Sequence, residues 1–389
     1  MENLKRGLAC FVVVFSICFS IYEAIFPFSF QVWAGSFQAY AQGARFHCEV
    51  FHVPQAFDPD YEEMERKFKI FVYPHNTTAC DNKPRMLNGE YGNEGLFYLN
   101  LNRSRFYTKD PEKAHLFLIP ISCHSSAAGK RSDDEKAIAV EDFVKSLISK
   151  YPYWNRTLGA DHFYVTCRDI NVTATARITN LMKNSIRVMC TPSYKDEYVP
   201  HKDVSLPQRV PPLARSPAGS NITNRMTLAF WRGLNNSHVR QKLLESWGND
   251  LELFIQKGKE PSFEEQDLVY HDAFNNSKYC ICPGGPELDR TIALAIHYGC
   301  VPVIFSDYYD LPFNDIIDWR KFSVILKESQ VSYMRELLDE ILEAEYRALQ
   351  TNTVMVRKHF QWNLLPIKYD AFHMTMYDLW LRNHFTKYY

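Results

Sequence analysis

The sequence carries almost no net charge. Its 44 lysines and arginines are balanced by 45 aspartates and glutamates, which gives a formal net charge of -1 at pH 7. A chain without a strong positive field does not attract a polyanion. The composition therefore argues against nucleic acid as a partner.

Neither of two common metal-site patterns stands out. The 10 cysteines include no CxxC pair and no accompanying histidine spacing, so zinc is the weaker interpretation of these residues. No DxD metal motif stands out either. We therefore expect no metal ligands and no required cofactor.

The length and the order of elements predict two lobes. A chain of 389 residues exceeds what one hydrophobic core holds, so two domains with a cleft between them are expected. Short apolar segments with turn residues on either side read as buried strands, and a segment with helical apolar spacing lies between them. This order predicts an α/β lobe with a mostly parallel sheet. The strands are expected at residues 69–73, 115–121, 162–167 and 185–190, and the helix at 140–148.

A second α/β lobe is expected after a linker. Residues 206–220 contain four prolines and break all periodicity. A strand at 226–231, a helix that reaches Trp247 and an amphipathic helix at 331–342 follow. The expected parts are residues 1–45 for a cytosolic tip, signal anchor and stem, 46–218 for the first lobe, 219–345 for the second, and 346–389 for helices that pack across the lobes.

The most informative stretch is residues 279–315. A short apolar strand runs into Pro283, Gly284 and Gly285, a helical segment follows, and Gly299 leads into a second apolar strand. A glycine-rich turn of this kind places backbone N–H groups and a helix N-terminus at the carboxyl end of a strand, where doubly wound sheets hold phosphates. An ordinary βαβ turn is the alternative, and the spacing alone does not decide between them.

Two arginines follow the strand at 226–231. Arg232 leaves the carboxyl end of that strand, and Arg240 lies in the first turns of the next helix. Both could point into the cleft, where a guanidinium fork suits a diphosphate. Two ordinary surface arginines are the alternative.

The N-terminus predicts a membrane anchor. Lys5 and Arg6 precede an apolar run at residues 7–21, and basic residues before such a run favour a cytosolic N-terminus and a translocated body. The run is shorter than the roughly 17 to 25 residues of a spanning helix, and Ala39 and Ala41 form a small-x-small cleavage site. We favour a retained signal anchor over a cleaved signal. Either way, the body is lumenal or secreted.

Glycosylation sequons agree with the secretory pathway. The N-x-[ST] triplet is an acceptor pattern typical of secreted proteins. It occurs at Asn76, Asn102, Asn155, Asn171, Asn221, Asn235 and Asn275.

In an oxidising lumen, disulfide bonds are expected among the cysteines that follow the anchor. Cys167 and Cys190 end two neighbouring predicted strands and are the favoured pair. Cys280 and Cys282 share one face of a strand, so either of them could reach Cys300.

Several blocks of the sequence resemble those of the plant exostosin-like glycosyltransferases, and they occur in that family's order. They are YPYWNRTLGADHF, DPEKAHLFLIP, NSIRVMC, KDVSLP, CICPGG and HYGCVPVIFSDYYDLPFND, and the match runs from residue 69 to the C-terminus. The resemblance implies a type II Golgi membrane protein with two Rossmann-like lobes in the GT-B arrangement. It also implies an inverting enzyme that moves a sugar from a nucleotide donor, usually a UDP-sugar, onto a cell-wall polysaccharide.

The implied chemistry can be matched to residues. Inversion is one in-line displacement, so a base takes the acceptor's proton while the charge of the leaving diphosphate is stabilised from the other lobe. Asp161 and His162 are the candidates for the base, although such a pair can equally be structural. His115, His124 and His201 are weaker candidates. The expected nucleotide-sugar-binding residues are Arg232, Gly233, Arg240, Lys278, Pro283, Gly284, Gly285, Glu287 and Asp289.

One position departs from the family pattern. Relatives place an acidic residue before the Gly-Cys-x-Pro turn, whereas this chain has Leu294 there, and leucine cannot accept a hydrogen bond from the ribose or the donor sugar. Glu287 or Asp289 could substitute for it. The apolar face of the helix predicts that Leu294 is a core residue.

Two functional hypotheses follow. We prefer an active glycosyltransferase, whose partners are the donor, the polysaccharide acceptor and the Golgi membrane. The alternative, motivated by Leu294, is a non-catalytic subunit or scaffold for other glycosyltransferases. A secreted lectin is disfavoured, because its strands would read as alternating all-β segments.

Overall fold

The computed structural model describes residues 50–74, 87–89, 91–121, 132–167, 175, 177–210, 225–258, 268–285 and 287–386. These ranges belong to one compact unit, Val50–Tyr389. The expected anchor, His124 and the sequons at Asn76, Asn171 and Asn221 lie outside the described residues. Within the described ranges, none of the helices combines the length and the apolar character needed to cross a bilayer.

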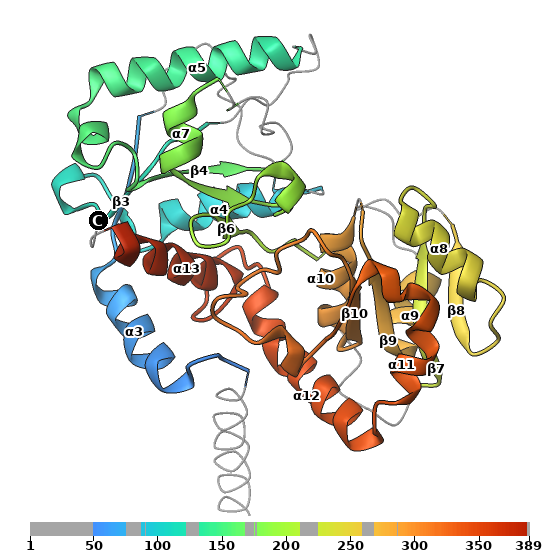
Figure 1. Ribbon diagram of the computed structural model, residues 1–389. Helices are drawn as coiled ribbons and strands as arrows, with labels where there is room; N and C mark the ends of the chain where they lie inside the picture. The colour runs from blue at the N-terminus through green and yellow to red at the C-terminus, as the bar shows by residue number, and fades with distance from the viewer. Residues whose placement is uncertain are drawn as a thin grey trace, which may run out of the picture. The chain divides into compact units, whose positions relative to one another are not determined.

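The first lobe is built on a parallel sheet, as the sequence predicts (Figure 1). The sheet has six strands, two more than the sequence indicated. Its order is β2-β1-β3-β4-β5-β6, and every neighbouring pair is parallel. The inner strands are short, apolar and buried, which is typical of a parallel sheet covered on both faces. The strands are β1 (Ile70–Val72), β2 (Tyr107–Thr108), β3 (Leu116–Leu118), β4 (His162–Thr166), β5 (Ile186–Met189) and β6 (Val204–Ser205).

Helices cover both faces of this sheet. Successive strand residues point to opposite faces, so Phe163 joins one hydrophobic cluster and Tyr164 another. The Tyr164 face packs against α5 (Asp133–Lys150) and α7 (Thr179–Asn184). The Phe163 face packs against α4 (Gly92–Arg103) and α13 (Ala371–Thr386), and α3 (Pro54–Lys67) packs on α13 (Figure 1).

The second lobe holds a parallel sheet of five strands in the order β11-β10-β9-β7-β8. One face packs against α8 (His238–Trp247), the 3-10 segment η6 (Glu328–Tyr333) and α11 (Met334–Asp339). The other face packs against α9 (Leu268–Asn276) and α10 (Leu288–Tyr298). The strands are β7 (Thr227–Gly233), β8 (Leu253–Lys257), β9 (Ser277–Pro283), β10 (Val301–Phe305) and β11 (Val324–Leu326).

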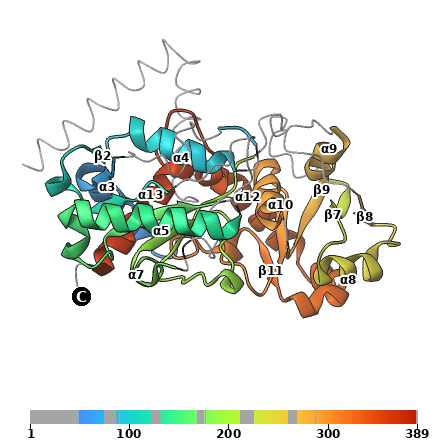
Figure 2. The ribbon, with the colours of Figure 1, turned by 90° about the horizontal axis from the view of Figure 1, so that it is seen from above.

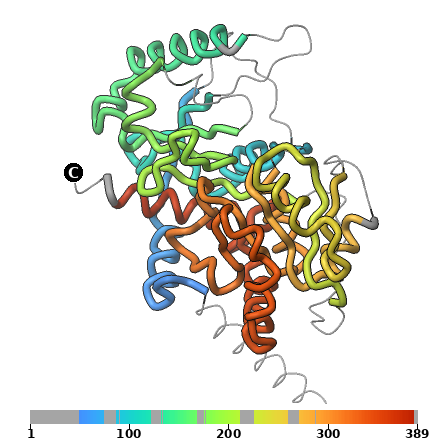
Figure 3. Tube along the Cα trace, turned by 45° about the vertical axis from the view of Figure 1, so that its right-hand side comes forward, coloured from blue at the N-terminus to red at the C-terminus, as the bar shows by residue number. Residues whose placement is uncertain are grey.

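The C-terminal helices contact both sheets. Helix α12 (Glu343–Phe360) packs against α10 and β10, whereas α13 packs against β6 and α3. Figure 2 and Figure 3 show the same path, with α12 beside the second sheet and α13 against the elements of the first. The chain therefore returns to the first lobe after completing the second. Four shorter 3-10 segments complete the described elements, at Pro111–Lys113, Pro152–Arg156, Tyr194–Asp196 and Trp319–Lys321.

Two disulfide bonds link the described cysteines. Cys167 bonds to Cys190, which confirms the favoured pair, and Cys280 bonds to Cys300. Strand register explains why Cys280 is the partner: it lies opposite Pro302, two residues from Cys300, whereas Cys282 lies opposite Ile304, four residues from Cys300. Cys282 is left as a buried free thiol.

Candidate functional site

In each sheet there is one place, the switch point, where the chain stops adding strands on one side of an earlier strand and begins to add them on the other side. In the second sheet the chain goes from β7 outward to β8 and then returns to the other side of β7 for β9. In the first sheet the same reversal lies between β1 and β3. Ligands of open α/β sheets bind outside the carboxyl ends of the strands at such a switch point. The two switch points are therefore the candidate functional sites.

At the second-lobe switch point, two helix N-termini lie side by side. The loop after β7 leads to Ser237, the N-cap of α8, and the turn after β9 leads to Glu287, the N-cap of α10. The two loops contact each other, because Ser237 Oγ donates a hydrogen bond to the Gly284 carbonyl at 2.8 Å. Both helix dipoles thus present their positive ends at the same edge of the sheet.

The glycine turn between β9 and α10 has only one exposed glycine. Gly284 donates its N–H to the Phe305 carbonyl at 2.7 Å, so this amide holds β9 to β10 and cannot face a ligand. Gly285 is exposed and has φ +115°, a conformation that favours glycine. The Gly284 amide, one of the expected donors to a ligand, is therefore already used within the sheet, and the Gly285 amide stays a candidate.

The N-terminus of α10 receives no capping hydrogen bond from its own N-cap side chain among the described residues. Glu287 has a left-handed backbone, with φ 67°, and its carboxylate lies 3.4 Å from Nη1 of Arg240 instead. In α8, by contrast, Ser237 Oγ accepts a hydrogen bond from Arg240 N at 3.3 Å. The first-turn amides of α10 thus form the kind of helix terminus that binds anions.

Arg232 and Arg240 lie on opposite faces of the sheet. Arg240 is completely buried on the α8 face, 5.9 Å from the ring of Trp231, and it also donates to Asn236 Oδ1 at 3.1 Å. Arg232 lies on the α9 face, 5.8 Å from the ring of Tyr270. The two guanidinium groups therefore do not meet at one point, although the sequence allowed both to point into the cleft. Arg240 instead ties Glu287 to the first turn of α8.

The other expected donor-side residues are spread along the sheet. Gly233 ends β7 and Pro283 ends β9, so both lie at the switch point. Asp289 lies in the first turn of α10 and accepts a hydrogen bond from Gln208 at 3.3 Å. Lys278 lies at the opposite, amino end of β9, where it pairs with Glu343 at 3.4 Å. Because β9 separates it from the glycine turn, the structure does not bring Lys278 into this site.

In the first lobe, Asp161 and His162 lie at the amino edge of β4. His162 is completely buried, with Nδ1 2.7 Å from Asp161 Oδ1 and Nε2 2.7 Å from the Tyr73 hydroxyl. Burial lowers the pKa of His162. Burial alone would raise the pKa of Asp161, but hydrogen bonds from His162 and Thr157 and the charge of Arg156 lower it overall.

Tyr73 connects this pair to the first-lobe switch point. It directly follows β1, at the carboxyl end of that strand, and burial raises its pKa. Tyr73 was not among the residues predicted for the site, although a polar side chain directly after a buried strand is a signal for such a position. The weaker candidate His115 accepts a hydrogen bond from the backbone of Lys69 at 3.1 Å, and His201 is exposed.

Comparison with known proteins decides the family. A model of the Exostosin GT47 domain matches residues 64–341, which is more than half of the chain. The chain belongs to the exostosin GT47 family. The family expected from the sequence blocks is therefore confirmed.

This GT47 chain is 34% identical over 341 residues to a probable glycosyltransferase of Arabidopsis thaliana, covering 84% of this chain and 64% of the relative. It is 26% identical over 345 residues to a probable β-1,4-xylosyltransferase of the same plant, covering 80% of this chain and 81% of that relative. A solved structure of HepE from Anabaena, in complex with UDP and glucose, aligns with 76% of this chain and 96% of its own, at 8% identity and a TM-score of 0.37. A TM-score this low supports no conclusion about the structure or function of this chain.

Three further features concern what the GT47 chain could bind. Leu294 is completely buried within α10 and belongs to the hydrophobic cluster that α10 shares with β9, as its sequence pattern predicts. Glu328, which the sequence did not single out, lies beside the glycine turn: a Cβ on Gly284 would be 2.9 Å from its Oε1. Over the described ranges, no group of three or more His, Cys, Asp and Glu side chains is placed to hold a metal.

Proposed function

We propose that this chain is an inverting glycosyltransferase of GT-B type, which moves a sugar from a UDP-sugar onto a plant cell-wall polysaccharide. The observation that carries the proposal is the second-lobe switch point, where Gly285 and the N-terminus of α10 lie beside the N-terminus of α8. Backbone amides and aligned dipoles at the carboxyl edge of a parallel sheet suit a diphosphate. Membership of the GT47 family supports glycosyl transfer as the reaction.

On the donor side, the Gly285 N–H and the first-turn amides of α10 stabilise the negative charge that develops on the leaving diphosphate. Arg240 is a positioning residue, because it holds the Glu287 carboxylate at the turn. Glu287 and Asp289, at the N-terminus of α10, offer carboxylates to hydroxyl groups of the ribose or the donor sugar, in place of the acid that Leu294 replaces.

On the acceptor side, we assign the base to the Asp161, His162 and Tyr73 chain of hydrogen bonds. The acceptor hydroxyl gives its proton to the Tyr73 oxygen while the Tyr73 proton passes to His162 Nε2, and because Tyr73 is only 1% exposed, the acceptor must enter the carboxyl end of β1 to reach it. Asp161 stabilises the imidazolium that results, in the manner of a catalytic triad. The lowered pKa of His162 keeps its ring neutral before the reaction but also makes it a weaker base, a cost that the charge of Asp161 offsets in part.

The proposed setting is the Golgi lumen, with residues 7–21 as the membrane anchor of a type II protein. The charge pattern around the apolar run and the seven sequons support this setting. The partners in this setting are the donor, the polysaccharide and the membrane.

A second candidate function is a non-catalytic subunit of a glycosyltransferase complex. The observation that favours it is Leu294, which is completely buried and offers no hydrogen-bond acceptor to a donor sugar. Under this hypothesis the second-lobe switch point would have lost its sugar contacts while the fold remained.

Turnover separates the two functions. We expect the full chain to release UDP from one of UDP-xylose, UDP-galactose, UDP-arabinose and UDP-glucuronic acid, and to do so faster when a wall oligosaccharide is present. UDP-xylose is the first choice, because one relative is named as a probable xylosyltransferase. Replacement of His162 by glutamine should lower kcat by about 100-fold or more, with UDP affinity unchanged.

Replacement of His115 by glutamine is the matched control, because His115 is also held by hydrogen bonding in the first lobe but lies outside the chain that reaches Tyr73. Equal losses in the two variants would contradict the role of His162. UDP binding without turnover of any donor would instead favour the subunit function.

A further inference from the structure

Two loops, one from each lobe, pair with each other through an antiparallel bridge and backbone hydrogen bonds. Ser193, after β5, forms an antiparallel bridge with Tyr309, after β10. Tyr194 N donates to the Tyr308 carbonyl at 2.8 Å, and Asp310 N donates to the Pro192 carbonyl at 2.9 Å. We call residues 191–198 and 306–310 the loop seam. Because each loop leaves the carboxyl end of its strand, the loop seam joins the carboxyl edges of the two sheets, and it is at these edges that open α/β sheets generally bind ligands.

Two tyrosine rings are exposed on the loop seam. Tyr194 is 43% exposed and Tyr308 is 45% exposed. The Tyr194 hydroxyl donates to Asp310 Oδ1 at 2.7 Å, and Lys195 Nζ lies 4.0 Å from the centre of the Tyr308 ring. Exposed aromatic side chains that are held in place are typical of binding surfaces, since little conformational entropy is lost when a ligand packs on them.

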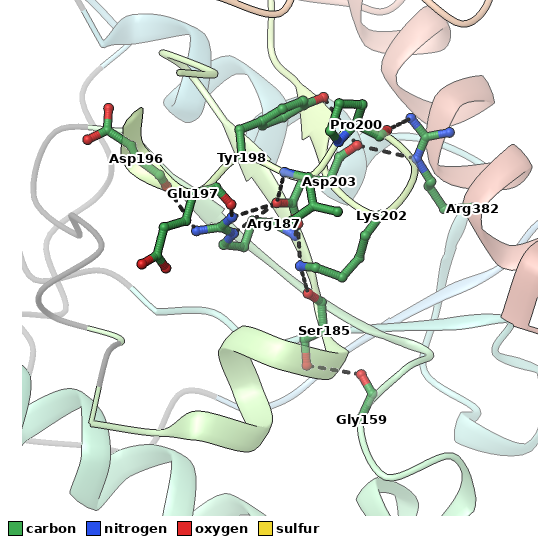
Figure 4. A network of polar contacts seen from close by, with 11 residues as sticks. Gly159, Ser185, Arg187, Asp196, Glu197, Tyr198, Pro200, Lys202, Asp203 and Arg382 are labelled. Carbon is green, nitrogen blue, oxygen red and sulfur yellow. Dashed lines mark hydrogen bonds and ion pairs between the residues drawn. The ribbon is translucent and has the colours of Figure 1, made fainter. Parts of the chain in front are cut away.

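A buried polar network fixes the first-lobe side of the loop seam (Figure 4). Asp203 accepts hydrogen bonds from Arg187 Nη2 at 2.7 Å and Val199 N at 3.0 Å, and its carbonyl accepts one from the Tyr198 hydroxyl at 3.2 Å. Arg382 of α13 donates to the Pro200 carbonyl at 2.8 Å and pairs with Asp315, on the second-lobe side, at 2.6 Å. The backbone that carries the Tyr194 ring is therefore held in place by hydrogen bonds and ion pairs to both lobes.

The charges beside the Tyr194 and Tyr308 rings indicate whether an acidic or an uncharged polymer would bind there. The two loops expose three carboxylates, those of Asp196, Glu197 and Asp307. They expose one ammonium group, that of Lys195. This surplus of carboxylates repels an acidic polymer. A pyranose ring, in contrast, has an apolar C–H face that packs on an aromatic ring and hydroxyl groups that hydrogen-bond at its edge.

We propose that Tyr194 and Tyr308 form an acceptor subsite that holds an uncharged polysaccharide chain at the loop seam. The inference rests on the proposed transferase function, because an acceptor must pass the carboxyl edges of both sheets to meet the donor. It adds the residues that hold the acceptor and the exclusion of acidic polymers.

Native affinity electrophoresis of the full chain tests the subsite. Gels contain β-1,4-xylan, xyloglucan, β-1,4-galactan or polygalacturonate, and the retardation gives a Kd for each polymer. We expect retardation by at least one of the three uncharged polymers and none by polygalacturonate. Replacement of Tyr308 or Tyr194 by alanine should raise that Kd about tenfold, whereas Tyr308→Phe should stay within about twofold.

Tyr333→Ala is the matched control, because Tyr333 is 64% exposed but lies at the end of η6, and η6 packs against the C-terminal end of α8 through Trp247. Its Kd should equal that of the unchanged chain. The subsite is overturned if no uncharged polymer retards the chain, if the alanine variants at Tyr194 and Tyr308 bind as tightly as Tyr333→Ala, or if polygalacturonate binds best.

UDP calorimetry on the same proteins separates this inference from the proposed function. A chain that binds UDP but no polysaccharide contradicts the subsite alone. A chain that binds polysaccharide through Tyr308 but binds no UDP contradicts the donor site alone.

Discussion

Replacement of Asp203 by alanine is expected to lower the free energy of unfolding by about 3 to 5 kcal/mol. Asp203 is completely buried, and its carboxylate pairs with Arg187, which is only 3% exposed, and with Lys202 (Figure 4). The variant would leave the guanidinium group of Arg187 in the interior without its partner charge. It would also remove the acceptor that holds Val199 N in the loop before β6.

Chemical denaturation of the full chain, followed by tryptophan fluorescence and by far-ultraviolet circular dichroism, measures this loss. Glu62→Ala is the matched control, because its pair with Lys368 is about half exposed on both sides and should contribute less than about 1 kcal/mol. An Asp203→Ala variant that is as stable as the control would contradict the structural role of the network.

Replacement of Gly285 by alanine is expected to weaken UDP binding about tenfold or more. The backbone at φ +115° is strained for any residue with a Cβ, and the new Cβ would lie 2.9 Å from Ser237 Cβ. Relief of either conflict moves the turn away from the N-terminus of α8. If UDP binds only to the native turn, a strain of about 1 to 3 kcal/mol in that turn weakens UDP binding by about tenfold or more.

Gly299→Ala is the matched control for calorimetry with UDP. Gly299 ends the same helix at φ +64°, and its Cβ would meet a side-chain atom of Val354 at 2.8 Å. This variant should lose stability yet bind UDP as the unchanged chain does. Equal UDP affinities for the two glycine variants would contradict the placement of the donor at Gly285.

The buried strands could be predicted because they are short and apolar on both faces. The segments at 69–73, 115–121, 162–167 and 185–190 correspond to β1, β3, β4 and β5. Helix α4 escaped prediction, because it buries polar residues as well as apolar ones: Asn93 and Asn100 are completely buried, and Asn100 donates to the Asn363 carbonyl. Such partners lie far away in the sequence and leave no periodic pattern.

One predicted helix is divided in the structure. The apolar spacing at 331–342 indicates a single amphipathic helix, but only Met334–Asp339 is α-helical and a 3-10 segment precedes it. The Val331 carbonyl accepts a hydrogen bond from Trp247 Nε1 at 2.7 Å, a contact with α8 that local spacing cannot reveal. Leu342, the last apolar residue of the pattern, is 72% exposed.

For the candidate site, the sequence indicated the turn but not its surroundings. The position of Gly284 and Gly285 between β9 and α10 followed from a strand, a glycine turn and a helix in succession. The separation of Arg232 from Arg240 could not be predicted, because it depends on which face of the sheet α8 covers. Tyr194 and Tyr308 come together only because two loops from different lobes pair.

Hydrogen exchange of the full chain with and without UDP, read by mass spectrometry, tests the central claim most directly. We expect saturating UDP to slow exchange in peptides that span residues 233–240 and 283–291, because the diphosphate binds between the N-termini of α8 and α10. Slower exchange confined to the first lobe, or no change at any UDP concentration, would contradict a donor site at the switch point between β7 and β9.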